Sequence, residues 1–472
     1  MSTRLACAHV VLCLVGLSPP IVRAAADAPA TQAARSARTV TIEGPVTGGS
    51  KGHPFSSSTV PLAPAGYTEN EYFISGTAHA FAPAPGSVAG QDGRWSAVAS
   101  GGEQPYKTRI LVRIPDRAHF NGTVLVEWMQ ELRSVERDIN FRWNAETMLR
   151  HGFAWVGVSL QHEGVDGDTG VSLKRWDPVR YGSLTIPNSD LSYDILSQVG
   201  AALGPARVAQ SVDPLDGLPV KHIVAVGNSL SAWRLSTYID AVQPTSHVFD
   251  GFFLQDFRQK TIDDREDAAF PHDRWVRSDV AVPTILLNMM PAALRSAGQP
   301  TGPNLRIWEP AGASHTNTFL MARGEIAEKR DVGFDIPYCA ASRANGIPTQ
   351  YFSSAALVAL DRWVKGGKAA PGFSPITVDA QGARIDDAGN ALGGMRHPWV
   401  DVPVARYTWD GDCIGGSGRT FPFSPAQLAQ RYGSPAGYLK QFTHAVRAAV
   451  RAGTILPEDM GAAINDARET TW

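Results

Sequence analysis

The chain of 472 residues combines 43% hydrophobic with 19% charged residues, which describes a soluble globular protein with a large core. Its net charge of -2 gives no electrostatic signal for nucleic acid or for an anionic membrane surface. Glycine (45 residues) and proline (33 residues) are frequent enough to predict many loops, but not disorder.

The first residues are typical of a secretory signal peptide. Arg4 precedes a short apolar run, two prolines break that run, and the three alanines at 24–26 offer an A-x-A cleavage site. We therefore expect a signal peptide at 1–26, a flexible leader at 27–38, and a protein that is periplasmic or secreted. The apolar run is too short to span a membrane, and no later segment is long and apolar enough to do so.

The mature chain would keep only two cysteines, Cys339 and Cys413. In an oxidising compartment, two cysteines most simply form one disulfide, and two unpaired thiols are the alternative. A disulfide would tie the C-terminal part of the chain to the part that precedes it.

Short apolar runs alternate with stretches of helical periodicity along most of the chain. We expect strands at 72–76, 109–114, 123–128, 154–160, 222–226, 249–254, 282–287 and 305–308, and helices near 145–150, 192–203, 235–242 and 356–364. The alternation predicts an α/β fold in which a mainly parallel sheet is covered by helices on both faces.

Two stretches depart from this alternation. Residues 161–190 form an insertion rich in Gly, Asp, Arg and aromatic residues, which either walls a pocket or packs as a surface loop. Residues 371–472 form a C-terminal extension with helical periodicity at 425–452, which Gly433-Ser434-Pro435 divides in two. We predict a core at 39–370 with the extension packed on it.

The most informative motif is Gly227-Asn228-Ser229-Leu230-Ser231, which lies between a predicted strand and a predicted helix. A serine between small residues on such a sharp turn is typical of a nucleophile elbow, which exposes the hydroxyl above the sheet. Ser231 stands where the usual G-x-S-x-G motif has its last glycine, and it is still small enough for the helix to approach the strand. Ser229 is therefore the predicted nucleophile, and an ordinary strand–turn–helix is the alternative.

A serine hydroxyl needs a nearby base, which this type of fold delivers on a loop after the last strand. His315 follows the last predicted strand by a short loop and is the predicted base, with His397 as the runner-up. An oxyanion hole needs two backbone N–H donors. By position, we expect Leu230 to give one donor and Met129 or Gln130 to give the other.

Further motifs occur in a fixed order from about Tyr72 to past Pro457. They include Phe120-Asn121-Gly122-Thr123-Val124, Val126-Glu127-Trp128, Trp176-Asp177-Pro178, Ser192-Tyr193-Asp194-Ile195, Trp308-Glu309 with His315, and Asp361-Arg362-Trp363-Val364. In these motifs the chain resembles the α/β-hydrolase superfamily and, more narrowly, a bacterial family of alpha/beta hydrolase domain proteins. The resemblance implies the α/β-hydrolase fold and a serine hydrolase with Ser229 as nucleophile and His315 as base. It implies little about the substrate.

One position departs from the family pattern. Family members generally carry an acidic pair soon after the strand that corresponds to 285–287, but this chain reads Asn288-Met289-Met290-Pro291-Ala292 there. We favour Asp256, which follows the preceding strand, as the triad acid. Glu309 in that role, a Ser–His dyad and an inactive site are the alternatives.

The sequence thus predicts an exported serine hydrolase that cleaves a carboxylic ester through an acyl-enzyme on Ser229. One alternative is a non-catalytic periplasmic binding or scaffold protein, and another is a hydrolase of amide, lactone or polyester bonds. No metal or nucleotide motif occurs, so we expect no metal and no cofactor. The expected partner is a small-molecule or polymeric ester, rather than nucleic acid or a membrane.

Overall fold

The computed structural model describes residues 40–88, 90–257, 275–333, 344–411 and 417–470. The predicted signal peptide, the predicted leader at 27–38, and both Cys339 and Cys413 lie outside these ranges, so the predicted disulfide stays a prediction. In the described ranges, no helix is both long and apolar enough to cross a membrane.

The described residues form a nine-stranded central sheet in the order β1-β2-β3-β7-β4-β8-β9-β10-β11. These strands are β1 (Thr41–Glu43), β2 (Tyr67–Pro83), β3 (Ala97–Pro115), β4 (Thr123–Trp128), β7 (Ala154–Val158), β8 (His222–Asn228), β9 (Gly251–Gln255), β10 (Thr284–Leu287) and β11 (Leu305–Trp308). Neighbours from β7 to β11 pair in parallel, whereas β1, β2, β3 and β7 pair antiparallel. The predicted α/β fold with a mainly parallel sheet is confirmed.

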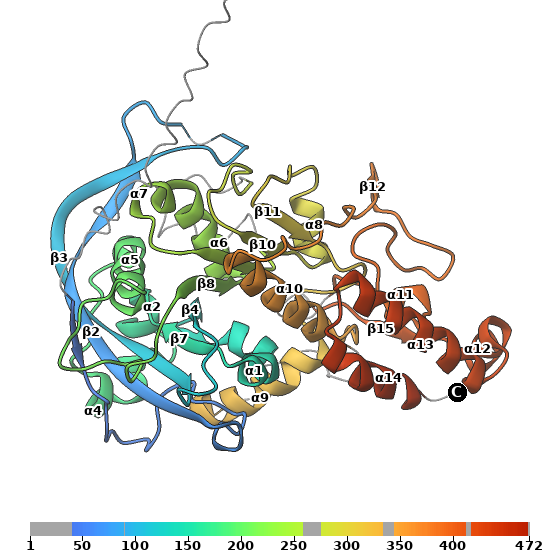
Figure 1. Cartoon of the computed structure of the whole chain (residues 1–472), viewed down its shortest axis with the longest axis horizontal. Coiled ribbons are helices and arrows are strands. Elements are labelled where there is room, and N and C mark those ends of the chain that lie inside the picture. Colours follow the sequence, from blue (N-terminus) through green and yellow to red (C-terminus); the bar gives the residue numbers. More distant parts are fainter. Residues whose placement is uncertain (1–39, 89, 258–274, 334–343, 412–416, 471–472) are drawn as a thin grey trace, which may run out of the picture. The chain divides into compact units, whose positions relative to one another are not determined.

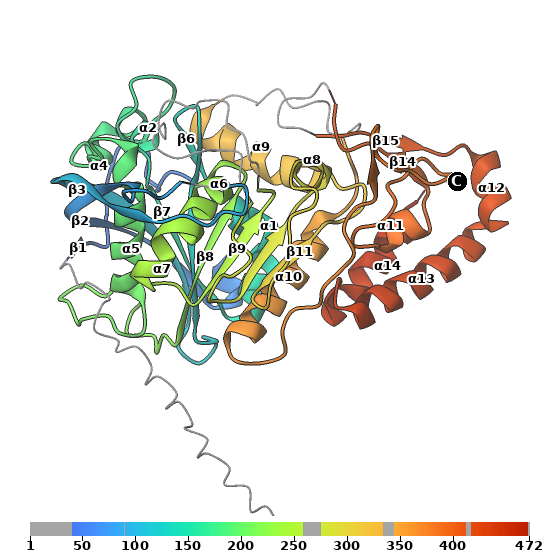
Figure 2. The ribbon, with the colours of Figure 1, turned by 90° about the horizontal axis from the view of Figure 1, so that it is seen from above.

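Helices cover both faces of this sheet, as the periodicity predicts (Figure 1, Figure 2). The larger described helices are α1 (Ile139–His151), α5 (Ser192–Leu203), α6 (Leu230–Thr237), α9 (Thr318–Val332) and α10 (Thr349–Val364), with the shorter α7 (Gln243–Ser246) and α8 (Met290–Arg295). Helices α5 and α6 share one buried cluster with the sheet, and α1 and α10 share the other.

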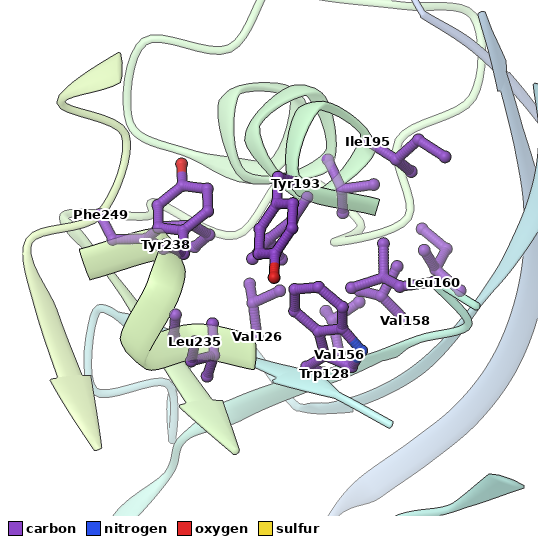
Figure 3. Packing of buried hydrophobic residues seen from close by; sticks show 14 of the residues in the cluster. Val126, Trp128, Val156, Val158, Leu160, Tyr193, Ile195, Leu235, Tyr238 and Phe249 are labelled. Carbon is purple, nitrogen blue, oxygen red and sulfur yellow. The ribbon is translucent and has the colours of Figure 1, made fainter. Parts of the chain in front are cut away.

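The strand pleat explains why there are two clusters. In β8, Ile223 and Ala225 face the first cluster, while Val224 and Val226 face the second. Figure 3 shows part of the first cluster, where Trp128 of β4 meets Tyr193 of α5 with the ring centroids 5.6 Å apart. Because both faces are buried, the parallel strands read as continuous apolar runs rather than as alternating ones.

Between β4 and α1 the chain makes a small hairpin that the sequence analysis does not predict. Its strands are β5 (Gln130–Leu132) and β6 (Val135–Arg137), and they pair antiparallel. The two turn residues, Arg133 and Ser134, have φ values of 57° and 62°, the geometry of a tight two-residue hairpin turn. Such turns usually carry Asn or Gly, and this one has neither.

The insertion at 161–190 folds into the short helices α2 (His162–Val165), α3 (Leu173–Trp176) and α4 (Pro178–Tyr181). Its two large aromatic side chains, Trp176 and Tyr181, are buried. The indole Nε1 of Trp176 donates to the carbonyl of Asp331 at 2.6 Å. The segment is therefore packed against the rest of the molecule through these two side chains.

The extension contributes α11 (Pro398–Asp401), α12 (Pro425–Tyr432), α13 (Pro435–Ala452) and α14 (Met460–Arg468), with the short strands β12 (Val378–Asp379), β13 (Gly382–Ala383), β14 (Ala405–Tyr407) and β15 (Thr420–Pro422). Both views place its helices at the β11 end of the sheet, away from β2 and β3 (Figure 1, Figure 2). Trp399 stacks on Tyr351 of α10 with ring centroids 5.7 Å apart, and Phe442 packs against Trp399. The extension thus shares the second buried cluster with α10.

Candidate active site

The elbow at Ser229 joins β8 to α6. Ser229 has φ 54° and ψ -114°, a strained conformation for a residue with a side chain, and it is 5% exposed. Backbone strain of this kind costs about 1–3 kcal/mol and is concentrated at functional sites. The N–H of Ser229 donates to the carbonyl of Gln255 at 3.0 Å, which ties the turn to the neighbouring strand.

Two small residues make this turn possible. A Cβ on Gly227 would lie 2.8 Å from Leu235 and 3.0 Å from the backbone nitrogen of Ala232, so only glycine lets α6 approach β8 this closely. The hydroxyl of Ser231 accepts from the N–H of Asn228 and donates to the carbonyl of Asn228, both at 2.9 Å. Ser231 therefore braces the turn with hydrogen bonds that a glycine could not make.

The structure brings Asp256 and His315 into contact. Asp256 follows β9 with φ 54°, and its N–H donates to the carbonyl of Leu287 at 2.7 Å. Its carboxylate contacts Nδ1 of His315, which lies after β11. Asp256 is 0% exposed and His315 is 9% exposed. The pair therefore forms inside the protein, at the carboxyl edge of the parallel strands where Ser229 also lies.

The other candidate acid and base side chains lie elsewhere. Glu309 is buried, and its Oε2 accepts from the N–H of Ile376 in the extension at 2.7 Å. The ring of His397 is packed on Phe352, and its Nε2 lies 2.7 Å from the carbonyl oxygen of Ala311. Both side chains therefore hold the extension to the core.

At the family's usual acid position, Asn288 is fully buried. Its Nδ2 donates to the hydroxyl of Ser296 at 3.1 Å. Because β9 and β10 are parallel neighbours that pair Gln255 with Leu287, their carboxyl ends lie at the same level of the sheet. An acid at Asp256 therefore stands one strand away from the position that Asn288 occupies.

Burial lowers the pKa of His315 to about 4, so the imidazole is neutral at neutral pH. The Asp256 contact favours the tautomer that carries its proton on Nδ1, which leaves Nε2 free to accept a proton. Within the described residues no hydrogen bond joins His315 to Ser229. Catalytic hydrogen bonds are often loose before substrate binds, so this geometry is compatible with a working pair.

The expected oxyanion donors fare differently. Leu230 is the first residue of α6, where a backbone N–H has no acceptor within the helix. The N–H of Met129, in contrast, donates to the carbonyl of Val158 at 3.1 Å, so the sheet already uses this amide. Gln130 pairs with Arg137 in the hairpin. At this position after a two-residue turn, the backbone N–H points toward the partner strand, so the N–H of Gln130 is directed at β6.

The hairpin register leaves one amide of this segment turned outward. Glu131 is paired with Glu136 between two hydrogen-bonding pairs, so its N–H points away from β6. Strand β5 lies beside α6, the helix that begins after Ser229. The sequence analysis missed Glu131 because the hairpin that orients it carries no Gly or Asn at its turn.

In the described part of the chain, no group of three or more His, Cys, Asp or Glu side chains is arranged to hold a metal ion. The carboxyl edge presents a strained serine, a neutral imidazole with its carboxylate, and a helix N-terminus.

Comparisons with known proteins place this geometry in context. Among solved structures, the chain is similar to a brefeldin A esterase described as a bacterial homologue of human hormone-sensitive lipase, with 10% identity, coverage of 59% of this chain and 80% of that one, and a TM-score of 0.33. It is also similar to a thermophilic esterase from Thermogutta terrifontis, with 12% identity, 43% and 76% coverage, and a TM-score of 0.26. A putative acetyl xylan esterase from Bacteroides fragilis gives 12% identity, 52% and 66% coverage, and a TM-score of 0.27.

These TM-scores are too low for the likenesses to carry an argument about this chain. No curated protein matches it. The family model described as alpha/beta hydrolase domain, however, matches residues 42–465, which include the whole carboxyl edge with Ser229, Asp256 and His315. The chain therefore belongs to the alpha/beta hydrolase domain family.

Proposed function

We propose that the protein is a serine hydrolase that cleaves carboxylic esters. The observation that carries this proposal is the contact between Asp256 and Nδ1 of His315, at the sheet edge where Ser229 occupies a strained elbow. A buried carboxylate against one imidazole nitrogen, with the other nitrogen free to take a proton, is the arrangement that activates a serine.

In the proposed mechanism, the Oγ of Ser229 attacks the acyl carbonyl carbon while Nε2 of His315 takes the hydroxyl proton. The carbonyl oxygen becomes an oxyanion, which the N–H of Leu230 and an outward N–H of the β5–β6 hairpin stabilise. The tetrahedral intermediate collapses as the imidazolium gives its proton to the leaving alcohol. Water then attacks the acyl-enzyme with His315 as base and releases the acid.

The Asp256 carboxylate holds the His315 ring in one tautomer and stabilises the imidazolium that forms. Since the family's usual acid position reads Asn288, we propose that the acid of this protein lies on β9 instead of β10. The contact weighs against a non-catalytic scaffold, because a protein that had lost the chemistry would have no need of a new acid for the same histidine.

We further propose that the protein is exported and carries a Cys339–Cys413 disulfide. The support is the signal-peptide pattern at 1–26 and the presence of only two cysteines after it. A small-molecule ester is the simplest substrate for such a hydrolase, and a polymeric ester uses the same chemistry.

The test is hydrolysis by the purified mature protein of p-nitrophenyl acetate and butyrate beside the matching p-nitroanilides, with Ser229→Ala as control. We expect ester turnover that Ser229→Ala abolishes, and little anilide turnover. Anilide turnover equal to ester turnover would instead make the protein an amidase. Ester turnover unchanged in Ser229→Ala would overturn the proposed nucleophile, and no turnover by well-folded protein would favour the binding-protein alternative.

A further inference from the structure

Glu127 is a buried carboxylate that the proposed mechanism does not use. It is the penultimate residue of β4 and is 0% exposed. Its Oε1 accepts from the N–H of Asn140 at 2.8 Å. Its Oε2 accepts from the N–H of Phe141 at 3.1 Å and from the indole Nε1 of Trp155 at 2.8 Å. Three donors thus converge on one carboxylate.

Two of these donors belong to the first turn of α1, where backbone N–H groups lack partners within the helix. The residue that precedes the helix, Asp138, makes no side-chain capping bond. Its carboxylate instead binds Arg113 and Arg142, at 2.7 and 2.8 Å. Glu127 of β4 therefore caps the N-terminus of α1. A carboxylate is favoured at a helix N-terminus.

The groups around Glu127 make the capping of α1 sensitive to the chemical form of the Glu127 side chain. Burial, and secondarily Asp138, raise the pKa of Glu127 to about 8, while the three N–H donors act in the opposite sense. The guanidinium of Arg113 lies 3.9 Å from the ring centroid of Phe141 and 4.2 Å from that of Trp155, so a buried cation packs on two of the residues that donate to Glu127. A glutamine here would direct its NH₂ group at N–H donors.

The chain between Glu127 and Asn140 leaves the sheet, forms the β5–β6 hairpin and returns to α1. Glu127 binds across this excursion, because its carboxylate joins the end of β4 to the start of α1. The same hairpin carries the outward amide of Glu131 and lies beside α6. The position of that amide relative to Ser229 therefore depends on where the excursion begins and ends, together with Glu136 of β6, whose carboxylate accepts from Arg109 and from Ser159.

We propose that Glu127 is a positioning residue that fixes the hairpin against the sheet and so aims one of its backbone N–H groups at the oxyanion formed on Ser229. This inference rests on the proposed serine hydrolase function. It assigns Glu127 no contact with the substrate: the carboxylate acts through the backbone of the hairpin and the first turn of α1.

The test compares Glu127→Gln with Asp177→Asn. Asp177 is a matched control because it is also 0% exposed and its carboxylate accepts three backbone N–H groups, from Ser50, Lys51 and Arg180, at 2.6, 3.0 and 3.1 Å. It ties α4 to the chain near Ser50, away from the elbow. For each protein, a fluorophosphonate would titrate the active sites, and kcat and KM for p-nitrophenyl butyrate would be expressed per titrated site, beside Tm.

We expect Glu127→Gln to lower kcat per titrated site about 10- to 100-fold with KM little changed, because loss of an oriented oxyanion donor acts on the transition state. Asp177→Asn should lower Tm and leave kcat per titrated site unchanged. If Glu127→Gln shows that same pattern, its role is merely structural and the inference is overturned.

Glu127→Asp serves as a second variant should the glutamine protein fail to fold. It keeps the carboxyl group but withdraws it from α1, so kcat per titrated site should fall by less than in Glu127→Gln, and an unchanged value would overturn the inference. A wild-type protein that takes up no fluorophosphonate overturns the proposed function and this inference together. Normal labelling of the wild type with an unaffected Glu127→Gln overturns the inference alone.

Discussion

Two buried polar regions of this protein use similar groups in opposite ways. Near β2 and β3, Arg109 donates to Glu71 at 3.0 Å, to Glu136 at 3.2 Å and to the hydroxyl of Ser159 at 2.9 Å. Arg180 donates to the second oxygen of Glu71 at 2.6 Å. At the carboxyl edge, the Asp256 carboxylate contacts Nδ1 of His315, and Ser229 at the same edge sits in a strained turn.

The first region, the Glu71 cluster (Glu71, Arg109, Glu136 and Arg180), neutralises its charges internally, and each cation has more than one oxygen partner. The carboxyl edge, in contrast, presents a neutral imidazole with a nitrogen free to accept a proton, and a helix N-terminus at Leu230. An internally paired cluster fixes structure, whereas an edge with strain and a free acceptor is suited to move a proton. The following predictions test this contrast.

The largest effect is expected at the nucleophile. Ser229→Ala should lower kcat by a factor on the order of 10⁶, because loss of the attacking oxygen removes the covalent route. The same substitution should leave Tm equal or higher, since the change to alanine removes none of the core contacts. The measurement is ester hydrolysis at high enzyme concentration, and residual activity near the wild-type value would mean that another residue attacks.

Replacing the acid should have the next largest effect. Asp256→Asn should lower kcat by about 10⁴, because the amide no longer holds the His315 tautomer or stabilises the imidazolium. Glu309→Gln is the control, since the Glu309 carboxylate binds Ile376 in the extension. If kcat per titrated active site falls further in Glu309→Gln than in Asp256→Asn, Glu309 and not Asp256 is the acid.

The pH dependence should follow His315. The base must be neutral, and burial lowers the pKa of His315 to about 4, so kcat/KM should be lost only as the pH falls through a value below the ordinary 6.5. The folded pKa lies below the unfolded one, so the unfolded state binds the proton first. The free energy of unfolding should therefore also fall as the pH drops from about 6.5 to 4. An acid limb of kcat/KM centred above 6.5 would contradict this assignment.

The Glu71 cluster should show the smallest effect on catalysis and a clear effect on stability. Glu71→Gln leaves Arg109 and Arg180 without their shared carboxylate, which should cost about 3–5 kcal/mol in the free energy of unfolding. Kinetics per titrated active site should change less than in Glu127→Gln, because Glu71 reaches the β5–β6 hairpin indirectly, through Arg109 and Glu136. Urea denaturation beside active-site titration measures both, and a loss of kcat without a loss of stability would erase the contrast between the two regions.

Much of the fold could be predicted because its signals are local. The β-branched run that ends at Asn228 and the helical spacing after it predict β8, the elbow and α6. The apolar runs from 123 to 308 predict the parallel strands to within a few residues. The long antiparallel pair β2–β3 is predicted only in part, since much of it reads as polar.

What could not be predicted depends on contacts between distant residues. That Glu309 binds Ile376 and that His397 approaches Ala311 follow from how the extension packs, which periodicity does not encode. The hydrogen bond from Met129 to Val158 depends on how β4 and β7 end relative to each other. Glu127 lies in a motif that carries the family resemblance, but its capping role could not be predicted, because a glutamate at a strand end is ordinary until the helix that it caps is in place.

The most direct test of the central claim is covalent labelling of the purified mature protein with a fluorophosphonate, read by intact mass and peptide mapping. The account predicts stoichiometric labelling at Ser229, and slower labelling in Asp256→Asn at the same site. Well-folded wild-type protein that takes up no label, or takes it up at a residue other than Ser229, would contradict it.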